Sequence, residues 1–286
     1  MRIRLDIAYD GSQFRGWARQ PGLRSVQGTL EAAVARVLGG EPRLVVAGRT
    51  DAGVHATGQV AHLDLDGSQV DRLMARSGRR DAASGTPPEP AARLAARLRG
   101  VLGAYADVTV RASSVAPAGF DARFSAVWRR YAYRVADSVS GYDPLERLRT
   151  TTVRADLDVD EMDAAARSLI GLHDFAAYCK PRDEATTIRT LLEFDWHRAE
   201  DGVLVANVKA DAFCHSMVRA LVGACVAVGE GRLDVPDVAA IRDGRERVPE
   251  IKVLAARGLT LTAVGYPADD QLAARADQTR ARRDRE

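Results

Sequence analysis

The chain has 286 residues, of which 46% are hydrophobic and 28% charged, with a formal net charge of +2. This length suits about two domains with their own cores. No apolar run approaches the roughly 18 residues of a membrane-spanning helix, so we expect no membrane span. The first residues alternate charged and apolar side chains, unlike a signal peptide. Three cysteines without a C-x-x-C pair predict neither a disulfide framework nor a cysteine zinc site. We therefore expect a reduced, cytoplasmic protein.

The first half of the chain alternates strand and helix patterns. Apolar residues at every second position predict a strand over 2–10, and Asp10-Gly11-Ser12 predicts a turn after it. Residues 76–90 are rich in Gly, Pro and Ser, which predicts an exposed insertion. The other predicted elements are a helix opened by Ser25 and ending before Gly39, strands at 44–47 and 59–65, a helix carrying Leu94, Leu98 and Leu102, and strands at 108–115 and 127–135.

The second half repeats these patterns after a predicted linker at 137–144. Its predicted elements are a helix carrying Met162, Ala166, Leu169 and Ile170, strands at 188–197 and 203–210, a strongly apolar helix at 216–228, and a strand at 259–264. We expect an α+β fold of two similar α/β subdomains, with mainly antiparallel sheets side by side and an active-site cleft between them. The expected boundaries are 1–140 and 145–267, and residues 268–286 are expected to be a disordered tail or a frayed helix.

The basic residues are unusual, because 38 of the 41 are arginine. Arginine suits bidentate contacts with phosphate and stacking on bases. Codon bias explains the same excess, so composition alone does not predict an RNA-binding protein.

Asp51 is the first candidate for chemistry. It lies in a loop with glycines on both sides, Gly48-Arg49-Thr50-Asp51-Ala52-Gly53-Val54-His55, between two predicted strands. A loop held by a rigid scaffold is a common location for functional residues. The structural alternative is an aspartate that bonds to its own turn.

Arg219 is the second candidate, because it lies in the strongly apolar helix. Such a helix is mostly buried, and a buried guanidinium needs a carboxylate partner. Asp51 is one candidate partner, and a structural ion pair with Asp211 or Glu230 is the alternative. Arg49 is interpreted either as a solvated arginine or as one that inserts toward a nucleotide.

Tyr131 lies on the apolar face of its predicted strand. Packing in the core is its structural role, and stacking on a base is its functional alternative. The five histidines have no metal-ligand spacing, and no nucleotide-binding or nucleophile-elbow motif is present. The chemistry is therefore expected to depend on an aspartate, without a metal or a small-molecule cofactor.

The chain resembles the TruA-type tRNA pseudouridine synthases over roughly residues 2–267. The most specific stretch is the loop from Gly48 to His55. The other stretches that carry the resemblance are Tyr9-Asp10-Gly11-Ser12 with Phe14, Gly16-Trp17, Arg19-Gln20 and Ser25-Val26-Gln27, Phe120-Asp121-Ala122-Arg123-Phe124-Ser125, Arg129-Arg130-Tyr131, Gly171-Leu172-His173-Asp174-Phe175, Phe213 with His215-Ser216-Met217-Val218-Arg219, and Gly258-Leu259 to Gly265-Tyr266-Pro267.

The resemblance implies a role for each of four residues. Asp51 would be the catalytic residue, Arg49 would help to flip the target uridine, Tyr131 would stack on its base, and Arg219 would pair with Asp51. The family implies a homodimer that acts on the anticodon stem-loop of tRNA at about positions 38–40. Because the base is stacked before reaction, it must be flipped out to reach Asp51. Whether Asp51 attacks the ribose or acts as a base stays open.

Two other function classes are weighed against this enzyme. A non-catalytic protein that binds and remodels tRNA could use the same surface, but binding needs no buried Asp51–Arg219 pair. A carboxylate-dependent hydrolase usually needs a second acid or base close to the first. The loop around Asp51 offers only His55 for that role.

Overall fold

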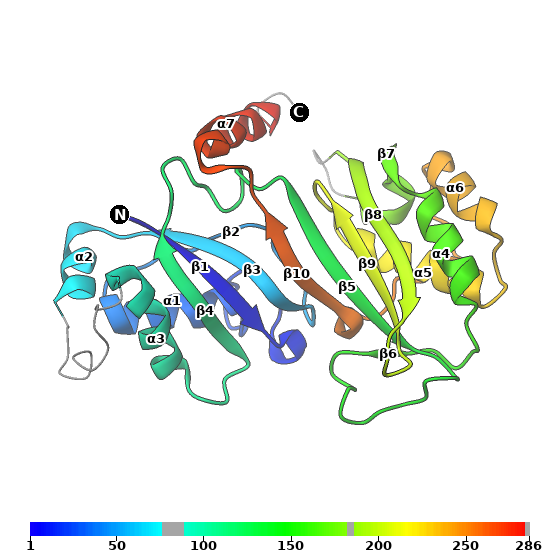
Figure 1. Cartoon of the computed structure of the whole chain (residues 1–286), viewed down its shortest axis with the longest axis horizontal. Helices are drawn as coiled ribbons and strands as arrows, with labels where there is room; N and C mark the ends of the chain where they lie inside the picture. The colour runs from blue at the N-terminus through cyan, green and yellow to red at the C-terminus, as the bar shows by residue number, and fades with distance from the viewer. Residues whose placement is uncertain (76–88, 182–185, 284–286) are drawn as a thin grey trace. The chain divides into compact units, whose positions relative to one another are not determined.

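The computed structural model describes residues 1–75, 89–181 and 186–283 (Figure 1). The chain forms two compact units, one from residues 1–126 with 266–282 and the other from residues 127–265. The predicted boundary at 140–145 is wrong, because the strand that begins at Trp128 already belongs to the second unit. None of the helices in this described part of the chain could cross a membrane.

The first unit contains an antiparallel sheet centred on β1 (Arg2–Tyr9), which pairs with β3 (His55–Asp64) and with β4 (Val108–Val115). The two-residue strand β2 (Val45–Val46) pairs with β3. Every second residue of β1 is buried, which confirms the predicted strand and places its apolar face in the core.

Three helices complete the core of the first unit: α1 (Val26–Leu38), α2 (Gly67–Met74) and α3 (Pro90–Leu102). Helix α1 contacts α3, and α3 packs on β4. The predicted start of α1 is confirmed, because the Ser25 hydroxyl accepts a hydrogen bond from the Gly28 N–H at 3.2 Å. The predicted insertion at 76–90 lies outside the described residues up to position 88.

The second unit contains a larger, mainly antiparallel sheet with a helical layer. Helix α4 (Val159–Ser168) contacts strand β8 (Ile188–Arg198) and the two other helices of this unit. This mixture of helices and antiparallel strands in both units confirms the expected fold class. The strand order is β10 (Leu259–Gly265), β5 (Trp128–Ala136), β9 (Leu204–Ala210), β8 (Ile188–Arg198) and β7 (Gly171–Asp174), with β6 (Thr151–Thr152) parallel to β5, and the helices are α4 (Val159–Ser168), α5 (Met217–Gly229) and α6 (Val235–Gly244).

The segment after residue 267, for which the sequence predicts a disordered tail or a frayed helix, is helical over most of the part that the structure describes. It forms helix α7 (Leu272–Arg283), which belongs to the first unit up to residue 282. Leu272 and Ala276 are buried, the Ser125 hydroxyl donates to the Leu272 carbonyl at 3.0 Å, and Arg280 pairs with Asp121 at 2.9 Å. Two buried apolar residues, one hydrogen bond and one ion pair thus connect this mainly polar helix to the first unit.

Cys179 and Cys214 form a disulfide bond in the second unit, with their Cα atoms 5.8 Å apart. The prediction that the cysteines are not paired is therefore wrong for these two. Sequence spacing could not show this pair, because 35 residues separate its members. Cys225 is a free, buried thiol, and burial raises its pKa to about 12.

Candidate active site

Asp51 lies in the loop between β2 and β3 and is half-buried. Its backbone carbonyl accepts a hydrogen bond from the Val54 N–H at 3.2 Å, which closes a tight turn. Gly53 within this turn has a φ of 80°, a conformation that favours glycine. The turn therefore requires a glycine two residues after Asp51.

A second loop, at residues 11–17, packs on this turn through backbone contacts. The Trp17 N–H donates to the Thr50 carbonyl at 3.0 Å, and the Gly53 N–H donates to the Phe14 carbonyl at 3.4 Å. Gly16 has a φ of 88°, and a Cβ atom there would lie 3.0 Å from the Thr50 carbonyl oxygen. The two loops are thus held together on both sides of Asp51.

The end of the Asp51 loop is held by His55. Its Nδ1 atom lies 3.0 Å from the Gly11 nitrogen, which donates to it, and 3.1 Å from a carboxylate oxygen of Asp10. Gly11 permits this approach, because a Cβ atom there would lie 2.0 Å from the Val54 carbonyl oxygen. His55 therefore connects the two loops, a structural role that its position in the sequence does not indicate.

Three polar side chains are buried in the first unit next to the same loop. The Tyr9 hydroxyl and the Thr50 hydroxyl are 2.8 Å apart, and the Gln59 amide donates to Tyr9 at 3.3 Å and to the Gly48 carbonyl at 2.9 Å. Their exposed fractions are 5% for Tyr9, 7% for Thr50 and 0% for Gln59. This network was not predicted from the sequence, although a glutamine inside an apolar strand is a signal for it.

Arg49 is exposed and shares the Asp51 loop. The structure therefore places two of the four predicted site residues together in the first unit. Tyr131 and Arg219 belong to the second unit, on β5 and α5.

Tyr131 is 8% exposed and lies on the buried face of β5, as predicted. Its ring meets the ring of Phe213 edge to face, with centroids 5.2 Å apart and planes at 88°. Phe213 belongs to one of the sequence stretches that carry the family resemblance, but only the structure shows its contact with Tyr131. Such T-shaped contacts fix the plane of both rings.

Arg219 is the one residue of α5 that is not buried, so the expectation of a fully buried guanidinium is wrong. The prediction that the rest of this helix is buried is confirmed. The Arg219 Nε donates to the Leu254 carbonyl at 2.5 Å, and the Leu254 N–H donates to the Arg219 carbonyl at 3.2 Å. These two hydrogen bonds fix the backbone of Arg219 and the Nε atom of its side chain.

The two acids considered as structural partners of Arg219 have other partners. The Asp211 carboxylate accepts from the backbone N–H of Thr190 at 3.1 Å. The Glu230 carboxylate accepts from the Nε of Arg232 at 2.6 Å.

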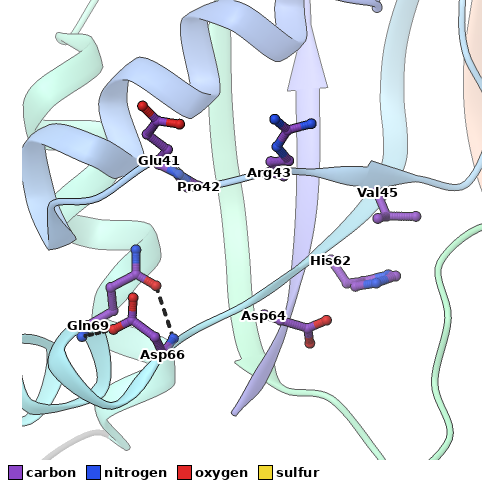
Figure 2. Close-up of a pocket in the computed structure, with 8 residues that line it drawn as sticks. All are labelled: Glu41, Pro42, Arg43, Val45, His62, Asp64, Asp66 and Gln69. Carbon is purple, nitrogen blue, oxygen red and sulfur yellow. Dashed lines mark hydrogen bonds between the residues drawn. The ribbon is translucent and has the colours of Figure 1, made fainter.

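Figure 2 shows a pocket of about 310 Å³ in the first unit, in which polar side chains predominate. Two of its three acidic residues have structural roles, because Asp64 pairs with Arg2 and Asp66 caps α2 through the Gln69 N–H. The four predicted site residues are not among its lining residues, which are Glu41, Pro42, Arg43, Val45, His62, Asp64, Asp66 and Gln69. We do not assign the candidate site to this pocket.

Comparisons with known proteins agree with the resemblance seen in the sequence. A family model described as tRNA pseudouridine synthase matches residues 165–267. The chain is 59% identical to tRNA pseudouridine synthase A of Leifsonia xyli over 99% of this chain and 97% of the relative. It is 52% identical to the protein of that name from Frankia casuarinae, over 98% and 95% of the two chains, and 44% identical to that of Corynebacterium glutamicum, over 99% and 96%.

Proposed function

Because this chain belongs to the tRNA pseudouridine synthase A family, and is thus an isomerase that converts uridine in tRNA to pseudouridine, we propose that Asp51 is its catalytic residue. We further propose that the target uridines lie in the anticodon stem-loop, at about positions 38–40. The observation that supports the role of Asp51 is the construction of its loop. The loop that carries the half-buried Asp51 is joined to a second loop by backbone hydrogen bonds on both sides of this residue.

The reaction needs no redox change, because uridine and pseudouridine contain the same atoms. The N1–C1′ bond breaks, the detached base rotates, and a C5–C1′ bond forms. The hydrogen on C5 is then lost as a proton, and N1 gains one. A positioned carboxylate can serve either as a nucleophile at the ribose or as a base that removes a proton from it. No small-molecule cofactor or metal is required by this balance.

Arg49 and Tyr131 suit the flipping of the uridine. A base inside a helical stem cannot reach a carboxylate, so it has to leave the stack. Arg49 is exposed on the Asp51 loop, where its guanidinium can take the place of the extruded base. Tyr131 offers a ring whose plane is fixed by Phe213, which suits stacking on a base.

Arg219 is proposed as the partner of the Asp51 carboxylate. A guanidinium has five N–H groups, and the bond to the Leu254 carbonyl uses one of them. A positive charge next to Asp51 would keep the carboxylate ionised when the substrate excludes water.

The proposed assembly is a homodimer, as the resemblance implies. The proposed location is the cytoplasm, where tRNA is modified. No membrane partner is proposed.

The test measures the release of tritium from tRNA that carries tritium on uridine C5. Wild-type protein is expected to release it, because C5 loses its hydrogen only when the base is reattached there. Asp51→Asn is expected to release none and to bind tRNA within a few-fold of wild type, because phosphate contacts dominate the affinity. Asp71→Asn, which changes an exposed carboxylate on α2 of the same unit, is the control and is expected to keep full activity.

The position is tested with the same assay on tRNA whose uridines at 38–40 are replaced by cytidine. Release from this tRNA would contradict the assignment to the anticodon stem-loop. Release by Asp51→Asn at the wild-type rate would contradict the role of Asp51. Binding without release by the wild-type protein would favour the non-catalytic alternative.

A further inference from the structure

We propose that the buried side chains of Tyr9, Thr50 and Gln59 position the Asp51 carboxylate for the reaction, and that the Tyr9 hydroxyl is needed for full turnover. This inference rests on the proposed catalytic role of Asp51. Tyr9 acts here through Thr50, so it is a positioning residue.

The network holds the chain on the N-terminal side of Asp51. Gln59 fixes the Gly48 carbonyl from the neighbouring strand at 2.9 Å, and the Tyr9 hydroxyl lies 2.8 Å from the hydroxyl of Thr50. The Thr50 carbonyl is held separately by the Trp17 N–H at 3.0 Å. Both the side chain and the backbone of the residue directly before Asp51 are thereby fixed.

The bonds form a relay with defined donors. The Gln59 side-chain nitrogen, Nε2, can only donate, so the Tyr9 oxygen accepts from it at 3.3 Å. The single Tyr9 proton is then available for the Thr50 oxygen. Burial raises the pKa of Tyr9 to about 12, so its hydroxyl keeps this proton at neutral pH.

Burial makes these hydrogen bonds important for the position of Asp51. All three side chains are buried, so water cannot readily replace a hydrogen bond that is removed. Without the Tyr9 hydroxyl, Thr50 has to find another partner, and the peptide that carries Asp51 can shift. A displacement of about 1 Å at a reacting group can reduce a rate by about 100-fold.

The experiment compares Tyr9→Phe with Tyr178→Phe. Both substitutions keep a buried ring and remove one hydroxyl. The Tyr178 hydroxyl donates to the Val238 carbonyl at 2.7 Å, and both residues belong to the second unit, whereas the Asp51 loop belongs to the first. Burial raises the pKa of Tyr178 as well, so the two hydroxyl groups are chemically matched.

Initial rates of tritium release give kcat and KM for each variant. Tyr9→Phe is expected to lower kcat about ten-fold or more and to change KM less than two-fold, because binding depends on phosphate contacts elsewhere. Tyr178→Phe is expected to leave both constants within two-fold of wild type. A Tyr9→Phe enzyme with wild-type kcat would overturn the proposal, and so would an equal loss in both variants.

A second pair of variants addresses Thr50 directly. Thr50→Val removes the hydroxyl and is expected to lower kcat as Tyr9→Phe does, whereas Thr50→Ser keeps the hydroxyl and is expected to restore it to within three-fold of wild type. This pair decides the matter if Tyr9→Phe does not fold. Equal kcat values for the valine and serine variants would refute the positioning role.

Failure of this inference can be told apart from failure of the proposed function. Asp51→Asn is measured in the same series. If Asp51→Asn turns over normally, the catalytic assignment fails and the inference fails with it. If Asp51→Asn is inactive while Tyr9→Phe and Thr50→Val are normal, the positioning role alone is wrong.

Discussion

Replacing Asp137 by asparagine is expected to destabilise the second unit by about 2–3 kcal/mol at neutral pH. Asp137 follows β5, and its side chain is fully buried. Arg198 donates to its two carboxylate oxygens at 3.1 and 2.7 Å, and the Ser140 N–H donates at 2.9 Å. Asparagine has nearly the same shape but carries no charge for the guanidinium.

The pKa of Asp137 gives the size of the effect. Burial by itself would raise this pKa, but the hydrogen bonds from Arg198 and Ser140 outweigh burial and hold the pKa at about 2. An unfolded aspartate has a pKa near 3.9, so the difference is about 2 units, which corresponds to about 2.5 kcal/mol. Because the folded pKa is the lower one, this stabilisation is present above about pH 4 and is lost as the pH falls toward 2.

Urea unfolding of wild type and Asp137→Asn, followed by tryptophan fluorescence from pH 7 to pH 2.5, measures this difference. The difference in unfolding free energy is expected to stay constant above about pH 5 and to shrink by most of its value below pH 4. Asp201→Asn is the matched control, since Asp201 also pairs with an arginine, Arg134 at 2.5 Å, but has 49% of its side chain exposed. This exposed pair is expected to contribute less than about 1 kcal/mol. A difference for Asp137→Asn that does not change with pH would refute the reasoning.

Three further results are expected. Gly11→Ala should abolish most tritium release and lower the melting temperature, because its Cβ would lie 2.0 Å from the Val54 carbonyl oxygen; a variant with wild-type activity and melting would contradict this geometry. Ser25→Ala should lower the unfolding free energy by about 1 kcal/mol in a urea titration, because the Gly28 N–H loses its cap; no measurable change would show that the cap is unimportant. Protein purified without reductant and then denatured should show one reactive thiol per chain, that of Cys225, and three thiols would show that the disulfide does not form.

Local patterns predicted most of the elements, but the buried face of strand β8 departs from simple alternation. Strict alternation from Ile188 to Trp196 predicts that Ile188 and Leu192 are buried, whereas they are 54% and 41% exposed. A bulge between Leu191 and Glu193 shifts the pattern, so that Leu191 is buried in the first half of the strand. A bulge depends on the partner strand, and the alternation within one strand does not reveal it.

The candidate site was also predictable only where its features depend on neighbouring residues in the sequence. The glycine-framed loop identified Asp51 from the sequence alone, because its composition is local. The half-buried state of Arg219 was not predictable, because it depends on the Leu254 carbonyl, 35 residues further along the chain. The Tyr9–Gln59 contact joins residues 50 positions apart, which no local pattern contains.

The return of the chain to the first unit through α7 has a consequence for biosynthesis. Residues 127–265 emerge from the ribosome after the first 126 residues and before α7. Gly119 is packed against α7 so closely that a Cβ atom there would lie 2.6 Å from the Cβ of Ala273. The N-terminal unit therefore waits through the synthesis of some 140 residues for its last helix, which at 5–20 residues per second is about 7–28 seconds. During that interval the surface that later holds α7 is open to chaperones and to neighbouring nascent chains.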